Sequence, residues 1–374
     1  MGRRFTNLMF AAAVGLAFGV AAAAHEAKAA GYVQTNLVSD GGAGGGGVKI
    51  KAKFTDPQLQ DPWGIAFFPG GAIWVSDNNT NLATIYNGAG DIFTPAQGST
   101  PGGFSIPGGA PTGQVSNTQN SARSGIFMVP NAPGTTGTAP ADFIFDSEAG
   151  IISAWQPGDG KAAVAVVDNS AAKAVYKGLA IGNTAAGTFL YATDFGHGVV
   201  EMYDSTFKLV KKFTDRALPA GYAPFGIANI DGQLYVTFAK QNPQKHDDVP
   251  GPGNGYVDVF NTDGMLVQHF AAGGALNAPW GVARAPLGFG EASSNILIGN
   301  FGDGWINQFA PNGTAIGPMM TPKGYPIAIN GLWTIAFPNN AWGGAAAASP
   351  TTLYFTAGPG NELDGVFGTL TPAH

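Results

Sequence analysis

Cysteine is absent from the 374 residues of this chain. Without thiols the protein cannot form a disulfide, a cysteine zinc site, an iron–sulfur cluster or a thiol nucleophile. Charged residues are also scarce, at 11% of the chain, and the formal net charge is −6. Because there is no basic run, nucleic acid and anionic membrane surfaces are poor partners. The sequence carries neither the GxSxG nor the HExxH signature of common hydrolases.

Long apolar runs are absent after the first 29 residues, so we expect no membrane span in the folded protein. Residues 1–29 predict a secretory signal peptide, with Arg3 and Arg4 at a basic start and a small-x-small cleavage site at 27–29. The alternative is a membrane anchor, but the apolar stretch 8–24 is short, at about 17 residues, and rich in alanine. We therefore expect an exported protein, periplasmic or extracellular. Its residues 30–374 have 15 basic and 23 acidic side chains, a net charge of −8, and are predicted to form one domain.

Glycine and proline are abundant, with 57 and 26 residues, and one glycine-containing phrase recurs along the chain. Its clearest copies are PWGIAF (62–67), PFGIAN (224–229) and PWGVAR (279–284). Weaker copies are KGLAIG (177–182), LWTIAF (332–337) and SGIFMV (124–129). The copies are 61, 53, 48, 55 and 53 residues apart when the following residues are aligned: Gly64, Gly125, Gly178, Gly226, Gly281 and Thr334. Six buried strands at this spacing predict a six-bladed β-propeller.

Further short strands follow each phrase, which predicts an all-β fold with blades of four antiparallel strands. The third blade is the clearest, with strands at 177–182, 188–194, 198–204 and 207–213. We expect the second blade to begin with an inner strand at 124–130, after a long loop at 94–122. The last repeat supplies only three strands, whereas the alternating stretch 32–38 is a strand without a blade. We therefore predict that this N-terminal strand pairs with the last blade and closes the ring.

Three stretches resemble the NHL-type propeller repeat, namely VSDNNTNLATIYN (75–87), ATDFGHGVVEMYD (192–204) and IGNFGDGWINQFA (298–310). Over nearly all of residues 30–374, the chain also resembles a family of uncharacterised exported bacterial propeller proteins. The matching stretches are TNLVSD (35–40), DPWGIAF (61–67), WVSDN (74–78), KHDDVPGPGNGYVDVF (245–260), NAPWGVA (277–283), GNFGDG (299–304) and INGLWTIAF (329–337). The resemblance implies a six-bladed propeller and carries no catalytic assignment.

Strand alternation brings two sets of loops to the same end of the ring. The loop leading into each inner strand and the loop between the second and third strands share one end, which we call the channel-mouth face. The candidate ligand-binding residues expected there are Trp63, Phe225, Trp280, Trp333, Lys245 and Asp248. Such an aromatic ring could hold a small molecule, a glycan or a protein, although the same side chains could instead pack between blades.

Oxygen-bearing side chains in the same loops define a candidate metal site. Its ligands are Asp77, Asn78, Asp146, Asp194, Asn300 and Asp303, which suit a divalent cation such as calcium. Radial symmetry could aim these groups at the axis, but Asp and Asn at strand ends also stabilise their own turns. His197, His246 and Asp247 are the candidate catalytic residues, because an imidazole beside a metal can move a proton.

Three functions are compatible with this pattern. The first is a monomeric binding module that uses the channel-mouth face, and the lack of a catalytic signature favours it. The second is a metal-dependent hydrolase or lyase, by analogy with the six-bladed calcium lactonases of the paraoxonase and gluconolactonase kind. Those lactonases use an inner-strand glutamate, which no inner strand of this chain carries. The third is a purely structural surface protein, which the concentration of loops on one face disfavours.

Overall fold

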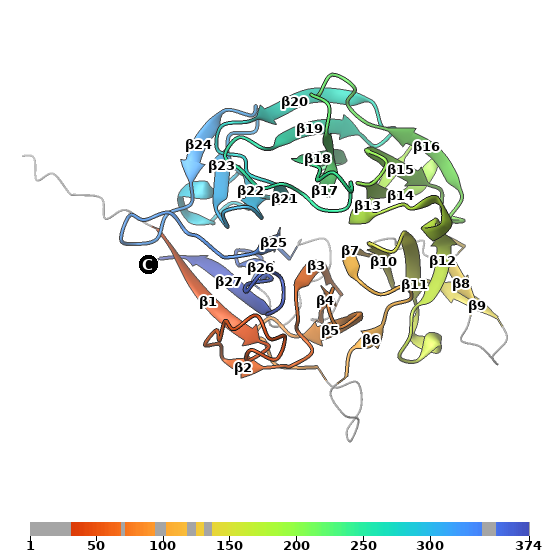
Figure 1. Cartoon of the computed structure of the whole chain (residues 1–374), viewed down its shortest axis with the longest axis horizontal. Helices are drawn as coiled ribbons and strands as arrows, with labels where there is room; N and C mark the ends of the chain where they lie inside the picture. Colours follow the sequence, from red (N-terminus) through yellow and green to blue (C-terminus); the bar gives the residue numbers. More distant parts are fainter. Residues whose placement is uncertain are drawn as a thin grey trace, which may run out of the picture.

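The structure is a computed structural model that describes residues 31–68, 72–93, 102–117, 125–130, 137–338 and 349–373. Within them, six blades of four antiparallel strands are arranged in a ring around a central axis (Figure 1). Helical structure in this part of the chain is limited to three short 3-10 turns, η1 (Pro157–Asp159), η2 (Ser170–Ala172) and η3 (Gly290–Ala292). The predicted all-β, six-bladed fold is therefore confirmed.

The strands of the first three blades follow the chain from the inside of the ring to the outside. Blade one consists of β3 (Pro62–Phe67), β4 (Ile73–Asp77), β5 (Leu82–Tyr86) and β6 (Phe104–Ser105). Blade two consists of β7 (Pro111–Ser116), β10 (Phe143–Ser147), β11 (Ile151–Trp155) and β12 (Val164–Asp168). Blade three consists of β13 (Tyr176–Thr184), β14 (Gly187–Asp194), β15 (Val199–Tyr203) and β16 (Leu209–Phe213).

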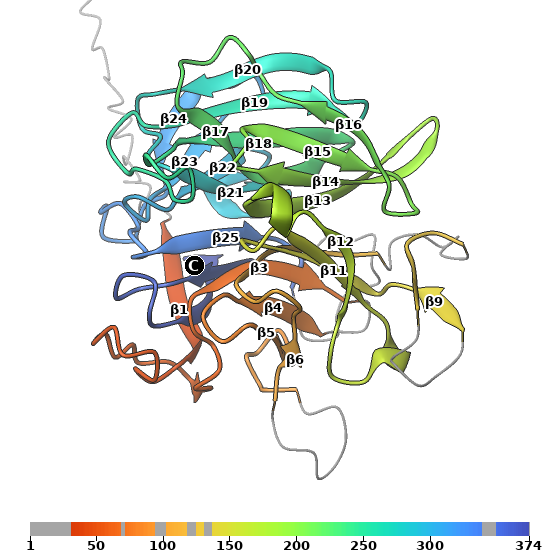
Figure 2. The ribbon, with the colours of Figure 1, turned by 45° about the vertical axis from the view of Figure 1, so that its right-hand side comes forward.

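Blades four and five repeat this order. Blade four consists of β17 (Tyr222–Ile230), β18 (Gln233–Lys240), β19 (Tyr256–Asn261) and β20 (Leu266–Ala272). Blade five consists of β21 (Pro279–Arg284), β22 (Ile296–Asn300), β23 (Ile306–Phe309) and β24 (Ala315–Pro318). Figure 2 shows the third and outer strands of blade four, β19 and β20, lying side by side at the top of the molecule.

Blade six combines both ends of the chain. Its inner three strands are β25 (Leu332–Ala336), β26 (Leu353–Ala357) and β27 (Val366–Pro372). The N-terminal strand β1 (Tyr32–Ser39) pairs antiparallel with β27 from Tyr32↔Pro372 to Ser39↔Val366, with a register shift between Asn36 and Val38. A two-residue strand, β2 (Phe54–Thr55), adds to β1 in parallel.

The expected start of blade two was wrong. Its inner strand is β7, which lies inside the stretch interpreted from the sequence as a loop, whereas β8 (Met128–Pro130) pairs only with β9 (Thr138–Pro140). The reason lies in the repeated glycine. A Cβ on Gly113 would lie 2.3 Å from the backbone nitrogen of Leu179 in the next blade, but a Cβ on Gly125 would meet none of the described residues within 4 Å. Gly113 is therefore the true counterpart of Gly64.

The same close approach explains why the phrase repeats. A Cβ on Gly64 would lie 2.6 Å from the carbonyl oxygen of Thr112, and one on Gly226 would lie 2.1 Å from that of Trp280. Inner strands converge toward the axis, so their backbones meet where only glycine leaves room. In blade six Thr334 takes this position, and its hydroxyl donates to the carbonyl of Trp63 at 2.7 Å.

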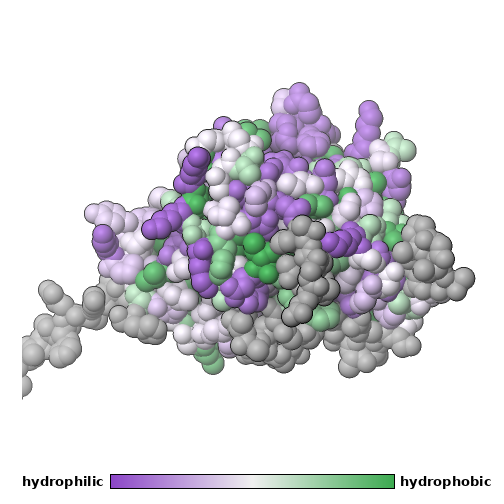
Figure 3. All heavy atoms as spheres, turned by 90° about the horizontal axis from the view of Figure 1, so that it is seen from below, coloured by the Kyte–Doolittle hydropathy of each residue, from purple (hydrophilic) through white to green (hydrophobic). Residues whose placement is uncertain are grey.

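Apolar side chains between neighbouring blades form the core. Between blades one and two, the rings of Trp74 and Phe143 stack with centroids 4.2 Å apart, and Trp155 packs beside them. Burial of one such side chain contributes roughly 2 to 3 kcal/mol, so contacts repeated around the ring hold the blades together. In the described part of the chain, no helix has the length and apolar character to cross a membrane. On the side shown in Figure 3, hydrophilic and hydrophobic residues are interspersed over the surface.

Candidate functional site

The predicted aromatic residues do meet at the channel mouth, but they are buried there against one another. The rings of Trp63 and Trp333 stack with centroids 3.4 Å apart, and Trp280 meets both edge-on at 6.0 Å. Phe225 packs at 6.0 Å from Trp333 and is fully buried. Edge-to-face and stacked pairs of this kind stabilise a core beyond the area they bury. The cluster therefore fills the axis at this end, and its ring faces are occupied by protein.

The three indole N–H groups of this cluster all have protein acceptors. Trp63 donates to Asp61 at 2.7 Å and Trp333 donates to the other oxygen of the same carboxyl at 2.8 Å. Trp280 donates to the backbone carbonyl of Lys177 at 2.9 Å. Burial raises the pKa of Asp61 well above its ordinary value, and the nearby carboxylate of Glu362 raises it further. Asp61 thus joins blades one and six beneath the channel mouth.

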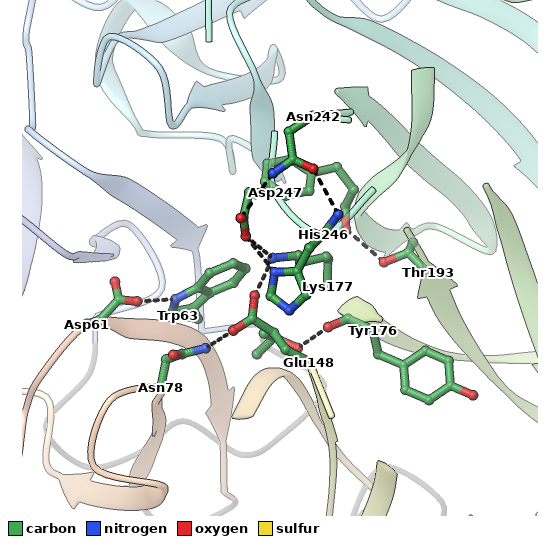
Figure 4. A network of polar contacts seen from close by, with 12 residues as sticks. Asp61, Trp63, Asn78, Glu148, Tyr176, Lys177, Thr193, Asn242, His246 and Asp247 are labelled. Atoms are coloured by element: carbon green, nitrogen blue, oxygen red, sulfur yellow. Dashed lines mark hydrogen bonds and ion pairs between the residues drawn. The ribbon is translucent and has the colours of Figure 1, made fainter. Parts of the chain in front are cut away.

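Lys177 brings a charged side chain into contact with this aromatic cluster (Figure 4). It precedes the repeated glycine in β13, the position held by Trp63 in β3, and only 2% of its surface is exposed. Its Nζ lies 5.2 Å from the ring centre of Trp63 and 6.0 Å from that of Phe195. The ammonium pairs with Glu148 and lies 3.6 Å from Oδ1 of Asp247. A buried ammonium in this position requires both carboxylates as counterions.

Glu148 and Asp247 pair with this ammonium, and the carboxylates of Asp248 and Glu362 also interact with it electrostatically. Burial alone would lower the pKa of Lys177, but the carboxylates, Glu148 first, more than offset burial and raise it. Burial raises the pKa of Asp248 to about 7 although Lys177 opposes the shift, and Oδ2 of Asp248 is buried without a hydrogen-bond partner. Burial also raises the pKa of Glu362, with Glu148 and Asp247 adding to the increase. The cluster therefore has more acidic groups than the lysine can balance.

The loops between second and third strands supply these acidic residues, as strand alternation requires. Glu148 lies between β10 and β11, Asp247 and Asp248 lie between β18 and β19, and Glu362 lies between β26 and β27. Asn78, in the corresponding turn of blade one, donates to Glu148 at 3.1 Å. Loops from four blades thus meet over the channel mouth.

A groove of about 750 Å³ opens beside this cluster, between the loops of blades three and four. Two imidazoles line it, and each is held through Nδ1 by a carboxylate. His197 lies 2.5 Å from Asp194, and His246 lies 2.7 Å from Asp247. Both rings are close to half exposed. The other lining residues that carry hydrogen-bonding side chains are Lys173, Asn242, Gln244 and Lys245.

The predicted metal ligands do not gather in one place. Asp77 accepts from the backbone N–H of Thr84 at 3.0 Å, and Asp146 accepts from the Thr112 hydroxyl at 2.8 Å. Asp194 accepts from His197, as described above. The remaining pair lies together in blade five, where Asn300 donates to Asp303 at 3.1 Å. These groups stabilise their own turns and inner strands.

Two other groups of three residues have ligand atoms within 4.8 Å of one another in the described part of the chain. The first consists of Glu148, His246 and Asp247 at the channel mouth. The second, on blade four, consists of Asp215, Asp258 and His269. Of the residues predicted from the sequence as catalytic, the structure brings His246 and Asp247 together and leaves His197 across the groove.

The sequence interpretation missed Lys177, Glu148 and Glu362. The signal for Lys177 was present, because KGLAIG places a lysine where three other copies of the phrase place tryptophan. No local pattern marked the two glutamates, since their proximity to Lys177 depends on the closed ring.

Comparison with known proteins gives the class and then the family. The NHL repeat family matches residues 59–82. The uncharacterized protein R648 of Acanthamoeba polyphaga mimivirus is 32% identical over 332 residues, which cover 86% of this chain and 77% of R648. The uncharacterized protein L690 of the same virus is 31% identical and covers 86% of this chain and 82% of its own length. The chain is therefore a β-propeller with an NHL repeat. It belongs to the family that includes R648 and L690.

A solved structure supports the architecture. A structural genomics protein of unknown function from Bacteroides thetaiotaomicron aligns over 91% of this chain and 76% of its own, with a TM-score of 0.53 and 12% identity. At that identity the likeness shows the fold alone. The two viral relatives do not support the bacterial origin and export that the resemblance implied.

Proposed function

We propose that this propeller is a binding module that holds a small polyhydroxylated ligand, such as a glycan, in the groove between blades three and four. The observation that carries this proposal is the mixture of hydrogen-bond donors and acceptors lining one concave site. Lys173 and Lys245 are donors, Asp247 is an acceptor, and the amide of Asn242 is both. A sugar hydroxyl is itself donor and acceptor, so a lining of alternating character suits it. Grooves of this volume are typical of small-ligand sites.

The hydrogen bonds already present orient this lining. Asn242 donates to Asp247 at 3.2 Å, and its carbonyl oxygen accepts from the backbone N–H of His246 at 3.1 Å. Lys177 and His246 both hold Asp247, and their effect exceeds the effect of burial, so the pKa of this carboxyl is lowered. An ionised acceptor fixed on two sides loses little freedom when a ligand binds.

The test is a binding screen of the purified chain against glycans and polyols, followed by equilibrium dialysis of any hit. We expect His246→Ala and Asn242→Ala to weaken binding at least tenfold. The matched control is Arg284→Ala, because Arg284 lies at the far end of the inner strand β21 and, among the described residues, forms its ion pair with exposed Asp231. Equal ligand affinity in the wild type and His246→Ala would contradict the proposal that the ligand binds in this groove.

One observation favours a second function, a metal-dependent hydrolase or lyase at the channel mouth. Glu148, His246 and Asp247 offer two carboxylates and an imidazole within reach of one ion. The ammonium of Lys177 already lies between the same carboxylates, so a metal ion would have to compete with it. Metal analysis of protein prepared without chelator tests this function. Loss of bound metal in His246→Ala, together with loss of lactone or ester hydrolysis, would support it over the binding module.

Export remains part of the proposal. Residues 1–30 lie outside the described residues, so the proposed signal peptide rests on their sequence alone. Expression of the full-length chain in a secreting host, followed by N-terminal sequencing, should give a mature protein that begins at Ala30. Size-exclusion chromatography with light scattering on that protein tests the proposed monomer. An unprocessed N-terminus or a stable dimer would contradict these two expectations.

A further inference from the structure

A second polar cluster lies on blade four, away from the channel-mouth groove. Asp258 is on the third strand, β19, and His269 is on the outer strand, β20. Asp215 belongs to the segment that links the outer strand of blade three to the inner strand of blade four. Both carboxylates are buried, with 2% and 5% of the Asp258 and Asp215 side chains exposed. The imidazole is 61% exposed, so the cluster opens to solvent on that side.

The distances within this cluster match those of a metal site. Nδ1 of His269 lies 3.0 Å from Oδ1 of Asp258 and 3.4 Å from Oδ2 of Asp215. Tetrahedral zinc with ligand bonds of about 2.0 to 2.1 Å places neighbouring ligand atoms about 3.3 to 3.4 Å apart. The two distances from the imidazole are close to this spacing, and the ligand atoms of all three residues lie within 4.8 Å of one another. A fourth position remains for water.

The two carboxylates of the cluster share one imidazole, and each has an oxygen without a hydrogen-bond partner. Oδ2 of Asp258 and Oδ2 of Asp215 are both buried without a hydrogen-bond partner. In the described residues, neither carboxylate has an ion pair with lysine or arginine, and His269 is the one basic side chain that reaches them. Buried carboxylates left in this way are costly unless a cation or a proton joins them.

Other blades show how the protein satisfies the same positions when no ion is needed. In blade three, Glu201 occupies the position of Asp258, and its cross-strand neighbour Lys212 pairs with it at 2.6 Å. In blade four the corresponding neighbour of Asp258 is His269. The permanent positive charge that Lys212 supplies in blade three is thus replaced by an imidazole in blade four.

Asp215, in the segment between blades three and four, can also be compared with an equivalent residue elsewhere in the chain. Asp56 and Asp215 occupy the same place in the repeated FTD sequence, and each accepts a backbone N–H two residues ahead, at 3.0 and 2.8 Å. The second oxygen of Asp56 accepts from the Tyr86 hydroxyl at 2.9 Å. Strand register places Phe260, which has no hydroxyl, where Tyr86 lies in blade one. The hydrogen bond within the turn therefore satisfies Oδ1 of Asp215, whereas Oδ2 has no hydroxyl donor like the one that Asp56 has.

We propose that Asp215, Asp258 and His269 form a binding site for a divalent transition-metal ion of the zinc class, which fastens the segment that follows blade three to blade four. A mixed imidazole and carboxylate set suits zinc, whereas calcium prefers six to eight oxygen ligands. Because binding requires this segment to be folded against blade four, the ion stabilises the native state by mass action.

The experiment uses the whole chain, stripped with EDTA and exchanged into metal-free buffer. Zinc chloride is titrated by calorimetry, and cobalt chloride is titrated by visible absorption, where tetrahedral coordination gives intense bands. We expect one zinc equivalent and a rise in Tm for the wild type. His269→Ala should bind zinc at least about tenfold more weakly and lose the cobalt bands. Because His269 is exposed, this variant tests the site without opening the core.

His246→Ala is the matched control, since it removes the imidazole of the channel-mouth cluster and leaves Asp215, Asp258 and His269 in place. Wild-type zinc affinity in His246→Ala, with weakened affinity in His269→Ala and Asp258→Asn, supports the proposed site. Wild-type affinity in His269→Ala would overturn it, as would a wild-type chain that binds no zinc at micromolar concentration. Loss of binding in His246→Ala alone would move the ion to the channel mouth and also overturn the proposal.

Discussion

Lys177 and Trp63 hold the same position in two different blades, and they meet at the axis, with Nζ of the lysine 5.2 Å from the centre of the indole ring. The repeat thus places one positive charge inside a ring of aromatic side chains. A cation over an indole face is attracted to it, by about 2 kcal/mol when desolvated. That attraction does not replace lost hydration, so the acidic loops above the ring supply the rest.

Replacement of Lys177 by methionine tests this relationship. The variant keeps the length of the side chain but leaves Glu148, Asp248 and Glu362 without their shared counterion. We expect the free energy of unfolding to fall by about 3 to 5 kcal/mol at pH 7, because removal of the ammonium leaves buried carboxylates without a counterion. Urea denaturation measures the change.

The control for this variant is Lys245→Met, in an exposed side chain of the same loop region. Its effect should stay within about 0.5 kcal/mol. Part of the loss in Lys177→Met should be recovered as the pH falls below about 7, because burial raises the pKa of Asp248 to about 7 and the variant lacks the ammonium that opposes this shift. An unfolding midpoint equal to that of the wild type at pH 7 would show that the ion pair adds no stability.

The buried carboxyl of Asp146 is expected to make the folded protein more stable as the pH falls. Burial raises its pKa to about 7, from an ordinary value of 3.8, although the Thr112 hydroxyl opposes the shift. The folded state therefore binds a proton more tightly than the unfolded state. This stabilising contribution is fully present below about pH 4 and is lost as the pH rises through 7.

Asp146→Asn imitates the protonated form and should remove that dependence. Between pH 3 and pH 8, the free energy of unfolding of the variant should rise relative to that of the wild type by up to about 4 kcal/mol, which corresponds to a pKa shift of about three units in Asp146. Asp168→Asn is a control of opposite sign, because hydrogen bonds from Ser170 lower the pKa of Asp168. Denaturation curves at pH 3, 6 and 8 decide the matter, and parallel profiles for wild type and Asp146→Asn would contradict the prediction.

The propeller could be predicted from the sequence because its physical cause is local and repeated. Inner strands meet at the axis, and this contact favours glycine at one fixed place in five of the six copies, as at Gly64 and Gly226. Blade two was misplaced because its copy, PTGQVS, keeps the proline and glycine but has threonine in place of the aromatic residue. The stretch around Gly125 offered a more apolar pattern and no glycine contact.

The candidate site could be predicted only in part, for a different reason. Alternation of strands is enough to bring His246 and Asp247 to the channel mouth. It does not say that Glu148, 29 residues before Lys177 in the chain, reaches the ammonium. It also does not reveal that the tryptophan rings close against one another, since that depends on the radius of the ring and on Asp61 below them.

The contrast between two glycines tests the revised start of blade two. Gly113→Ala would push a Cβ to within 2.3 Å of the Leu179 backbone nitrogen, so we expect a loss of about 3 kcal/mol or more. Gly125→Ala brings the new methyl group within 4 Å of none of the described residues, so we expect only the strain of its φ of 87°, about 1 kcal/mol. Thermal and urea unfolding of both variants should rank them in this order, and the reverse order would restore 124–130 as the inner strand.

Trp333→Phe isolates the role of the Asp61 carboxyl that joins blades one and six. Phenylalanine keeps an aromatic ring beside Trp63 but removes the N–H that reaches Oδ1 of Asp61 at 2.8 Å. A buried oxygen left without its donor costs about 1 to 3 kcal/mol, and some stacking area is lost as well. Trp74→Phe is the control, because Trp74 stacks on Phe143 between blades without contact to Asp61. In the double variant Trp333→Phe/Asp61→Asn the two losses should be less than additive, and full additivity in urea denaturation would show that the two residues do not act as a pair.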